Sequence, residues 1–230
     1  MSNLTKCKVD DLLQSYLVKD ACYDGVLEIP KLKPFKGNLN VNALVPFSER
    51  KRFGNPKYAL AFFEQDKRFK EAITSPEKFT EEIKKFKFVV SPDCSMYRDA
   101  PLVAQLSNLY NSRKVSYYWQ ANGVNILPLV RWGGDLTYTT QCFHKPPSFM
   151  GIEKNSPVCV SNYGCYKSKA DKFYFREGFK SMLKYLKPSA VVLYGAYDLQ
   201  LEKLSKKSTC KIIRFTNWSN YIHQRGDCVG

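Results

Sequence analysis

The chain has 230 residues, of which 44% are hydrophobic, so it is long and apolar enough to bury the core of one domain and is not an intrinsically disordered protein. Its 36 Lys and Arg residues outnumber its 21 Asp and Glu residues, which gives a formal net charge of +15. No run approaches the roughly 18 apolar residues of a membrane helix, and acidic residues near the N-terminus argue against a signal peptide. We therefore expect a cytoplasmic protein that binds no membrane.

The first 42 residues are predicted to form an N-terminal helix and a basic arm. Apolar residues recur with helical spacing from residue 9 to residue 22. Residues 29–42 are rich in Pro, Lys and Asn, a composition typical of an extended loop.

Residues 43–216 alternate between short apolar runs and helical patterns. We expect strands at 43–47, 58–63, 88–90, 124–130, 157–161, 190–194 and 211–215. Helices are expected at 76–86, between the third and fourth strands, at 169–187 and at 199–204. This alternation predicts an α/β fold with a mostly parallel sheet of about six strands and helices on both faces. A doubly wound sheet and a partial barrel both fit the pattern, and residues 217–230 would form a C-terminal tail.

Eight cysteines are scattered along the chain without a Cys-x-x-Cys pair. Structural zinc sites usually contain such close pairs, so we predict no metal site built from cysteines. Buried free thiols are the expected state of most of them.

Polar side chains follow several of the predicted strands, at the carboxyl ends where parallel sheets bind their ligands. The candidate catalytic residues are the carboxylates Asp93, Glu64 and Asp66. Such a group can act as a general base, and two or three together could hold a divalent metal such as Mg²⁺ for phosphodiester hydrolysis. The candidate ligand-binding residues at the same end are Ser95, Tyr97, Arg131, Trp132, Asn162 and Tyr163.

Several of these residues also have a simpler structural interpretation. Asp93 follows a proline in a sequence where Asp often binds nearby backbone amides. Arg131 could form an ion pair with a carboxylate at the end of the neighbouring strand, for which Asp93 is well placed. Trp132 could pack in the core.

The predicted helix at 169–187 carries a row of cations, which we call the basic stripe. Its members recur every three or four residues and are Lys169, Lys172, Arg176, Lys180, Lys184 and Lys187. Like charges at this spacing repel one another, so a phosphate backbone is a natural partner. A solvated helix face is the alternative. In a chain of this net charge we predict nucleic-acid binding, with DNA favoured over RNA.

Two motifs resemble those of a known family. They are the Pro-Asp-x-Ser sequence within SPDCSMYRDAP and the Trp-Gln-x-x-Gly turn within YYWQANGVNILPLVRW. They resemble an uncharacterised family, a domain of unknown function found in bacteria, phages and mobile elements, over about residues 45–215. Cys94 and Gln65 depart from its pattern, which is usually aromatic at the first position and acidic at the second. The resemblance supports the α/β fold and implies no chemistry.

Two classes of function remain open. The chain lacks a P-loop and a Gly-x-Ser-x-Gly elbow, which excludes ATP-driven motors and common esterases. The first class is a nucleic-acid-binding protein of a phage or mobile element, which could also be a metal-dependent nuclease. The second is an enzyme or sensor that binds a small anionic or sugar-like ligand at the strand ends. Inhibition of a host protein is a third alternative. A basic stripe beside the strand ends would favour a polynucleotide.

Overall fold

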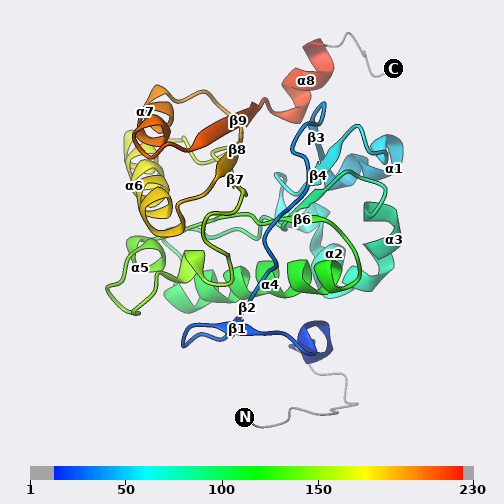
Figure 1. Ribbon diagram of the computed structural model, residues 1–230, viewed down its shortest axis with the longest axis horizontal. Coiled ribbons are helices and arrows are strands. Elements are labelled where there is room, and N and C mark those ends of the chain that lie inside the picture. The colour runs from blue at the N-terminus through cyan, green and yellow to red at the C-terminus, as the bar shows by residue number, and fades with distance from the viewer. Residues whose placement is uncertain (1–12, 225–230) are drawn as a thin grey trace.

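Short buried strands alternate with helices along residues 13–224, which the computed structural model describes (Figure 1). Seven strands of the described residues lie in two parallel sheets: β3 (Leu44–Pro46), β4 (Ala59–Ala61), β5 (Val89–Val90), β6 (Ile126–Leu127), β7 (Val158–Ser161), β8 (Ala190–Tyr194) and β9 (Lys211–Phe215). The first four form one sheet and the last three the other. Strands β1 (Tyr23–Asp24) and β2 (Ile29–Pro30) form a separate antiparallel pair.

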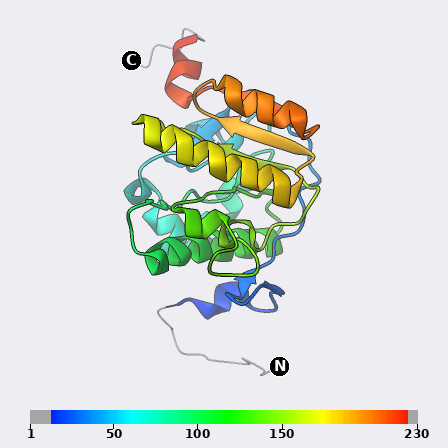
Figure 2. The ribbon, with the colours of Figure 1, turned by 90° about the vertical axis from the view of Figure 1, so that its left-hand side faces the viewer.

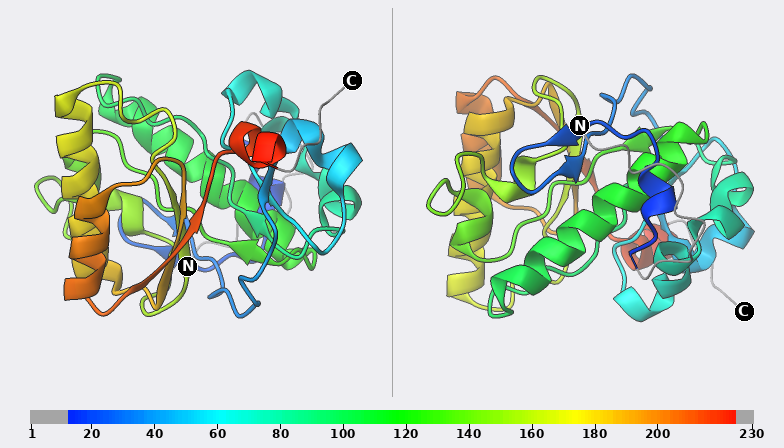
Figure 3. Two further views of the ribbon diagram at one scale, coloured as in Figure 1. Left: turned by 90° about the horizontal axis from the view of Figure 1, so that it is seen from above. Right: turned by 90° about the horizontal axis from the view of Figure 1, so that it is seen from below.

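Helices connect these strands and lie around them. The α-helices are α1 (Arg50–Phe53), α2 (Lys70–Thr74), α3 (Thr80–Ile83), α4 (Leu102–Ala121), α5 (Asp135–Tyr138), α6 (Lys169–Leu186), α7 (Leu199–Lys207) and α8 (Trp218–Gln224). The 3₁₀ helices are η1 (Ser15–Val18), η2 (Phe47–Glu49), η3 (Asp66–Arg68), η4 (Pro76–Phe79) and η5 (Pro147–Phe149). Seen from above, α6 and α7 lie on one side of the molecule and α1 to α3 on the other (Figure 3).

A backbone bridge joins the two parallel sheets. Leu129 pairs with Cys159, and the amide of Val130 donates a hydrogen bond to the Cys159 carbonyl at 2.8 Å. The strands from β3 to β9 therefore follow one another in chain order, all parallel, in two joined sheets rather than in the single sheet of about six strands that was predicted. A doubly wound sheet reverses its strand order at a switch point, so the observed order fits the partial barrel.

The two faces of the strands are buried against different partners. Side chains from both sheets meet in one cluster, which we call the inner cluster; it includes Leu44, Ala61, Val90, Leu127, Leu129, Cys159, Val192 and Tyr194. Residues that alternate with these, such as Leu60 and Val191, pack in the clusters to which the helices contribute. No described helix contributes to the inner cluster, so the helices cover one face rather than the two that were predicted. The strands themselves bury the other face.

Two of the predicted helices are not continuous. Residues 9–12 of the first lie outside the described part, and the remainder forms only the 3₁₀ helix η1. Gln14 and Asp20 have φ angles of 54° and 63°, a left-handed conformation that interrupts an α-helix. The helix predicted for 76–86 is divided into η4 and α3. The segment after residue 216 contains α8.

None of the helices in residues 13–224 is both long and apolar enough to span a bilayer. All cysteines within the same residues are free thiols. Cys94, Cys159 and Cys210 are buried, as predicted, whereas Cys22 and Cys142 are exposed.

Helix α6 packs closely against the end of the first sheet. Its apolar face, which includes Phe175, Phe179 and Met182, is buried in the cluster that also holds Trp132. Gly178 faces the indole directly: a Cβ atom there would lie 2.3 Å from Trp132 Nε1. The absence of a side chain at this position therefore sets how closely the helix approaches.

We predict that Gly178→Ala lowers the free energy of unfolding by about 1–3 kcal/mol, because the clash with a buried, rigid indole exceeds the gain in helix propensity. Urea unfolding monitored by circular dichroism measures the change. Lys184→Ala, at an exposed position of the same helix, is the control and should change the free energy by less than about 0.5 kcal/mol. Equal stability of Gly178→Ala and the wild type would contradict this packing.

Candidate functional site

The carboxyl ends of the parallel strands surround one cleft of about 620 Å³, which we call the carboxyl-end cleft. Every strand from β3 to β9 contributes a lining residue at or just after its end, namely Pro46, Glu64, Asp93, Arg131, Tyr163, Tyr194 and Asn217. Helix α8, which follows β9, lies at this end of the molecule and adds Trp218 (Figure 1). The cleft thus lies where the sequence predicted a site.

Asp93 and Arg131 form a largely buried ion pair in this cleft. Arg131 Nε lies 3.5 Å from Asp93 Oδ1, with the side chains 22% and 11% exposed, which confirms the predicted pairing. The guanidinium also donates to the Ser161 carbonyl at 3.4 Å, so it links the ends of three strands. Burial raises the pKa of Asp93; Arg131 opposes this, and the nearby Asp66 adds to it. A carboxyl group with a raised pKa beside a fixed cation is suited to accept and return a proton.

The other two candidate catalytic carboxylates are held by separate partners. Glu64 accepts a hydrogen bond from the Ser48 amide at 2.9 Å and lies 3.9 Å from Arg68. Asp66 accepts from both the amide and the hydroxyl of Ser95, at 3.1 and 2.8 Å, and does not line the cleft. Within residues 13–224, no three or more His, Cys, Asp and Glu side chains are grouped so that they could hold a metal ion. The three carboxylates therefore do not converge as the metal-site hypothesis required.

Exposed aromatic and basic side chains line the same cleft. Tyr97 is 65% exposed and Tyr163 51% exposed. Lys167 is exposed, and the Arg68 side chain is 59% exposed although it lies near Glu64. The cleft therefore offers exposed aromatic rings and exposed cations in addition to the buried ion pair.

Two of the predicted ligand-binding residues have structural partners instead of lining the cleft. Trp132 is buried, with its ring centroid 5.0 Å from that of Phe175, which matches its simpler interpretation as a core residue. Asn162 is also buried, and its side-chain amide donates to the Ala196 carbonyl and accepts from the Ala196 amide, both at 2.8 Å. This pair of hydrogen bonds ties the end of β7 to the end of β8.

Sequence reasoning missed the contributions of Lys167 and α8 to the cleft. Lys167 lies between the end of β7 and the start of α6, outside the periodic row of cations. Residue Asn217 accepts a hydrogen bond from the Asn220 amide at 2.9 Å and so caps the start of α8. The sequence Asn-Trp-Ser-Asn was a usable signal for that helix start, since Asn is a favoured N-cap residue.

The basic stripe lies along α6, which packs beside α7 on the outside of the three-stranded sheet (Figure 2). Five of its six members are exposed: Lys169, Lys172, Lys180, Lys184 and Lys187.

The sixth member of the basic stripe, Arg176, binds the buried Asp198 carboxylate with two hydrogen bonds of 2.9 and 3.0 Å. Burial alone would raise the pKa of Asp198, but the hydrogen bonds from Arg176, Tyr166 and the Gln200 amide lower it. Arg176 therefore joins two helices, and the available stripe consists of five lysines.

The stripe begins beside the cleft and leads away from it. Lys167 lines the cleft, and Lys169 starts the stripe two residues later. Because α6 connects the carboxyl end of β7 to the amino end of β8, the later lysines are progressively farther from the cleft. No member of the stripe lines the cleft.

The raised pKa of Asp93 predicts a pH-dependent stability. In the native protein the Asp93 carboxyl group keeps its proton at pH values where the same group in the unfolded chain, with its ordinary pKa of 3.8, has lost it. The stability that this carboxyl group contributes is therefore complete below pH 3.8, and it is lost as the pH rises through the pKa of the native group. The stability of Asp93→Asn relative to the wild type should accordingly improve from about pH 4 to about pH 7. Urea unfolding at several pH values measures this, with exposed Asp99→Asn as the control; a pH-independent difference would contradict it.

The Arg176–Asp198 pair gives a second prediction. Arg176→Gln should lower the free energy of unfolding by about 1–3 kcal/mol, because it removes hydrogen bonds from a buried carboxylate. The loss should diminish as the pH falls through the lowered native pKa of Asp198, where the carboxylate is protonated. Thermal and urea unfolding measure both effects. Lys184→Gln, in the same stripe but exposed, should leave stability unchanged, and an equal loss in both variants would refute the structural role of Arg176.

Comparisons with known proteins support the resemblance seen in the motifs. A family model described as a domain of unknown function, DUF4417, matches residues 21–216. The Gene 1 protein of Mycobacterium phage L5 is 34% identical over 137 residues, which are 60% of this chain and 57% of that protein. The Gene 1 protein of Mycobacterium phage D29 is also 34% identical over 137 residues, which are 60% of this chain and 48% of that protein.

The chain therefore spans about half the length of these two curated relatives. No solved structure matches it. Since the family model covers most of the sequence, the chain belongs to the DUF4417 family, a domain family of unknown function with phage-encoded relatives.

Proposed function

We propose that this protein binds nucleic acid, DNA in preference to RNA, and that a single-stranded segment crosses the carboxyl-end cleft. The observation that supports this most is the presence of exposed tyrosines and exposed cations in one cleft of a chain with a net charge of +15. Base stacking on an aromatic ring contributes about 1–3 kcal/mol per base and needs bases that are unpaired. Basic side chains hold the backbone through release of counterions.

Tyr163 and Lys167 are central to this proposal. Tyr163 is half exposed and follows β7, and Lys167 lies four residues later, in the segment that leads into α6. A base stacked on Tyr163 would place a neighbouring phosphate within reach of Lys167. From there the five exposed lysines of the basic stripe offer a continuous path for the rest of the strand.

The cleft also contains a group that could act on a bound strand. Asp93 is largely buried and has a raised pKa, and its Oδ1 atom has no hydrogen-bond partner although Arg131 lies 3.5 Å away. Cleavage of the strand is therefore a further step of the proposal. It is tested by incubating the protein–DNA complex and comparing the strand breaks formed by the wild type with those formed by Asp93→Asn.

The same ion pair favours a second candidate function, the binding of a small anionic or sugar-like ligand. Arg131 lines the cleft and its side chain is 22% exposed, so its guanidinium could bind an anionic group. This candidate requires the cleft but not the basic stripe. The two functions therefore differ in their dependence on the stripe lysines.

Fluorescence anisotropy with labelled single-stranded DNA of about 16 nucleotides, titrated against salt, tests the proposal. We expect a log affinity that falls linearly with log salt, with a slope reduced by about 2 when Lys172, Lys180 and Lys184 are changed to Gln.

Tyr163→Ala should weaken binding about 5- to 100-fold with little change in slope, because it removes stacking and no charge. Double-stranded DNA and RNA of the same sequence should bind less tightly.

A matched control changes three exposed lysines at the opposite ends of the strands, Lys57, Lys85 and Lys207, to Gln. This control keeps the same net charge as the stripe variant and should retain more of the salt slope. The absence of binding at about 100 mM salt would reject nucleic-acid binding and leave the small-ligand candidate. Equal losses in the stripe and control variants would mean that only net charge matters.

A further inference from the structure

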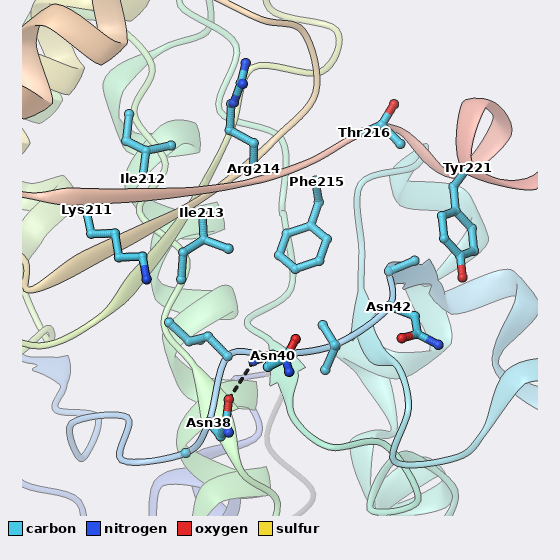
Figure 4. A pocket seen from close by; sticks show the side chains of 14 residues that line it. Asn38, Asn40, Asn42, Lys211, Ile212, Ile213, Arg214, Phe215, Thr216 and Tyr221 are labelled. Atoms are coloured by element: carbon cyan, nitrogen blue, oxygen red, sulfur yellow. Dashed lines mark hydrogen bonds between the residues drawn. The ribbon is translucent and has the colours of Figure 1, made fainter. Parts of the chain in front are cut away.

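A second cavity lies away from the carboxyl-end cleft, between the last strand and the arm. It has a volume of about 790 Å³ and is lined by residues 37–43, residues 211–216 and Tyr221 (Figure 4). Strand β9 is an outer strand of its sheet and pairs only with β8, and β3 is an outer strand of the other sheet and pairs only with β4. We call this cavity the edge gap, because it separates the two outer strands of the partial barrel.

The inner cluster is incompletely covered at the edge gap. Ile213 and Phe215 of β9 are only partly buried, although the equivalent residues of β8, Val192 and Tyr194, are fully buried in the same cluster. In Figure 4 the side chains of Ile213 and Phe215 point toward the chain segment that carries Asn40. The apolar residues of that segment also contact the cluster while remaining partly exposed.

The backbone of β9 is also incompletely paired on this side. No backbone hydrogen bond joins β9 to residues 37–43 in the described part of the chain. The backbone amide of Asn42 instead donates a hydrogen bond to the backbone carbonyl of Lys57 at 2.9 Å. The backbone carbonyl of Asn40 accepts a hydrogen bond from the Lys87 side chain at 3.0 Å. An outer strand with an open edge can pair with an added strand.

The charge of the edge gap indicates what kind of strand would fit. Its lining includes Lys211, which is exposed, and Arg214, but no Asp or Glu. The Arg214 side chain is 49% exposed and lies 3.7 Å from Glu202 on α7, so it is only partly compensated. Three asparagines, Asn38, Asn40 and Asn42, provide further polar groups on the opposite wall.

We propose that the edge gap binds an extended acidic segment of a partner protein, which adds to β9 as a further strand. Apolar side chains on one face of that segment would cover Ile213 and Phe215. The Lys211 side chain points to the same side of β9 as Ile213 and Phe215, and the Arg214 side chain points to the other side (Figure 4). An acidic side chain at the end of the apolar face would therefore meet Lys211, and acidic side chains on the other face would lie near Arg214. Main-chain hydrogen bonds would supply the affinity and the alternating side chains the specificity, as in other complexes formed by strand addition. This interaction is independent of the proposed nucleic-acid binding, since the edge gap shares no lining residue with the carboxyl-end cleft.

A labelled peptide of alternating Glu and Val residues, with two further Glu residues at each end so that one Glu on the Val face can reach Lys211, is the probe for this proposal. We expect it to bind the full chain in anisotropy measurements, and to slow hydrogen exchange at the amides of residues 211–215. Lys211→Glu should weaken binding about three- to tenfold, because one close attraction becomes a repulsion. Lys206→Glu, an equally exposed substitution on α7, is the matched control and should have a smaller effect.

Three outcomes would overturn the proposal. A peptide of alternating Lys and Val that binds equally well would show that charge does not select the occupant. The peptide would lie on the basic stripe if it failed to bind the variant in which Lys172, Lys180 and Lys184 are changed to Gln but still bound Lys211→Glu as tightly as the wild type. Sedimentation showing that the free protein forms a dimer that Lys211→Glu dissociates would mean that a second copy occupies the edge.

Discussion

The inner cluster is the constraint on which the proposed site depends. Each of the seven parallel strands in the described chain places side chains in it, so their carboxyl ends meet around one cleft. The bridge between Leu129 and Cys159 is the critical junction, because both residues also belong to the cluster. Asp93 follows a strand of one sheet and Tyr163 a strand of the other, so this junction determines whether they line the same cleft.

Much of this arrangement could be predicted from local patterns. Short apolar runs located the strands, and the rule that parallel strands bind ligands at their carboxyl ends located the cleft. The pairing of Asp93 with Arg131 followed from their positions after adjacent strands. Whether the strands would form an open sheet or a partial barrel could not be predicted, because the same alternation of strands and helices is compatible with both.

The roles that sequence reasoning assigned less well depend on partners distant in the chain. Periodicity placed Arg176 in the basic stripe, but its carboxylate partner lies 22 residues later at the start of another helix. Asp66 follows a strand as a catalytic residue would, yet it binds Ser95, 29 residues away. Trp132 follows a strand too, and its burial results from its contact with α6. A residue's type and local spacing cannot show which distant group satisfies its hydrogen bonds.

The central claim is that a nucleic-acid strand crosses the carboxyl-end cleft, and cross-linking tests it most directly. Single-stranded DNA that contains a photoreactive pyrimidine would be irradiated in complex with the full chain, and the modified peptides identified by mass spectrometry. The account predicts cross-links at Tyr163 or Tyr97, the two exposed tyrosines of the cleft. Cross-links confined to residues outside the cleft, in a complex that binds with the expected salt dependence, would contradict it.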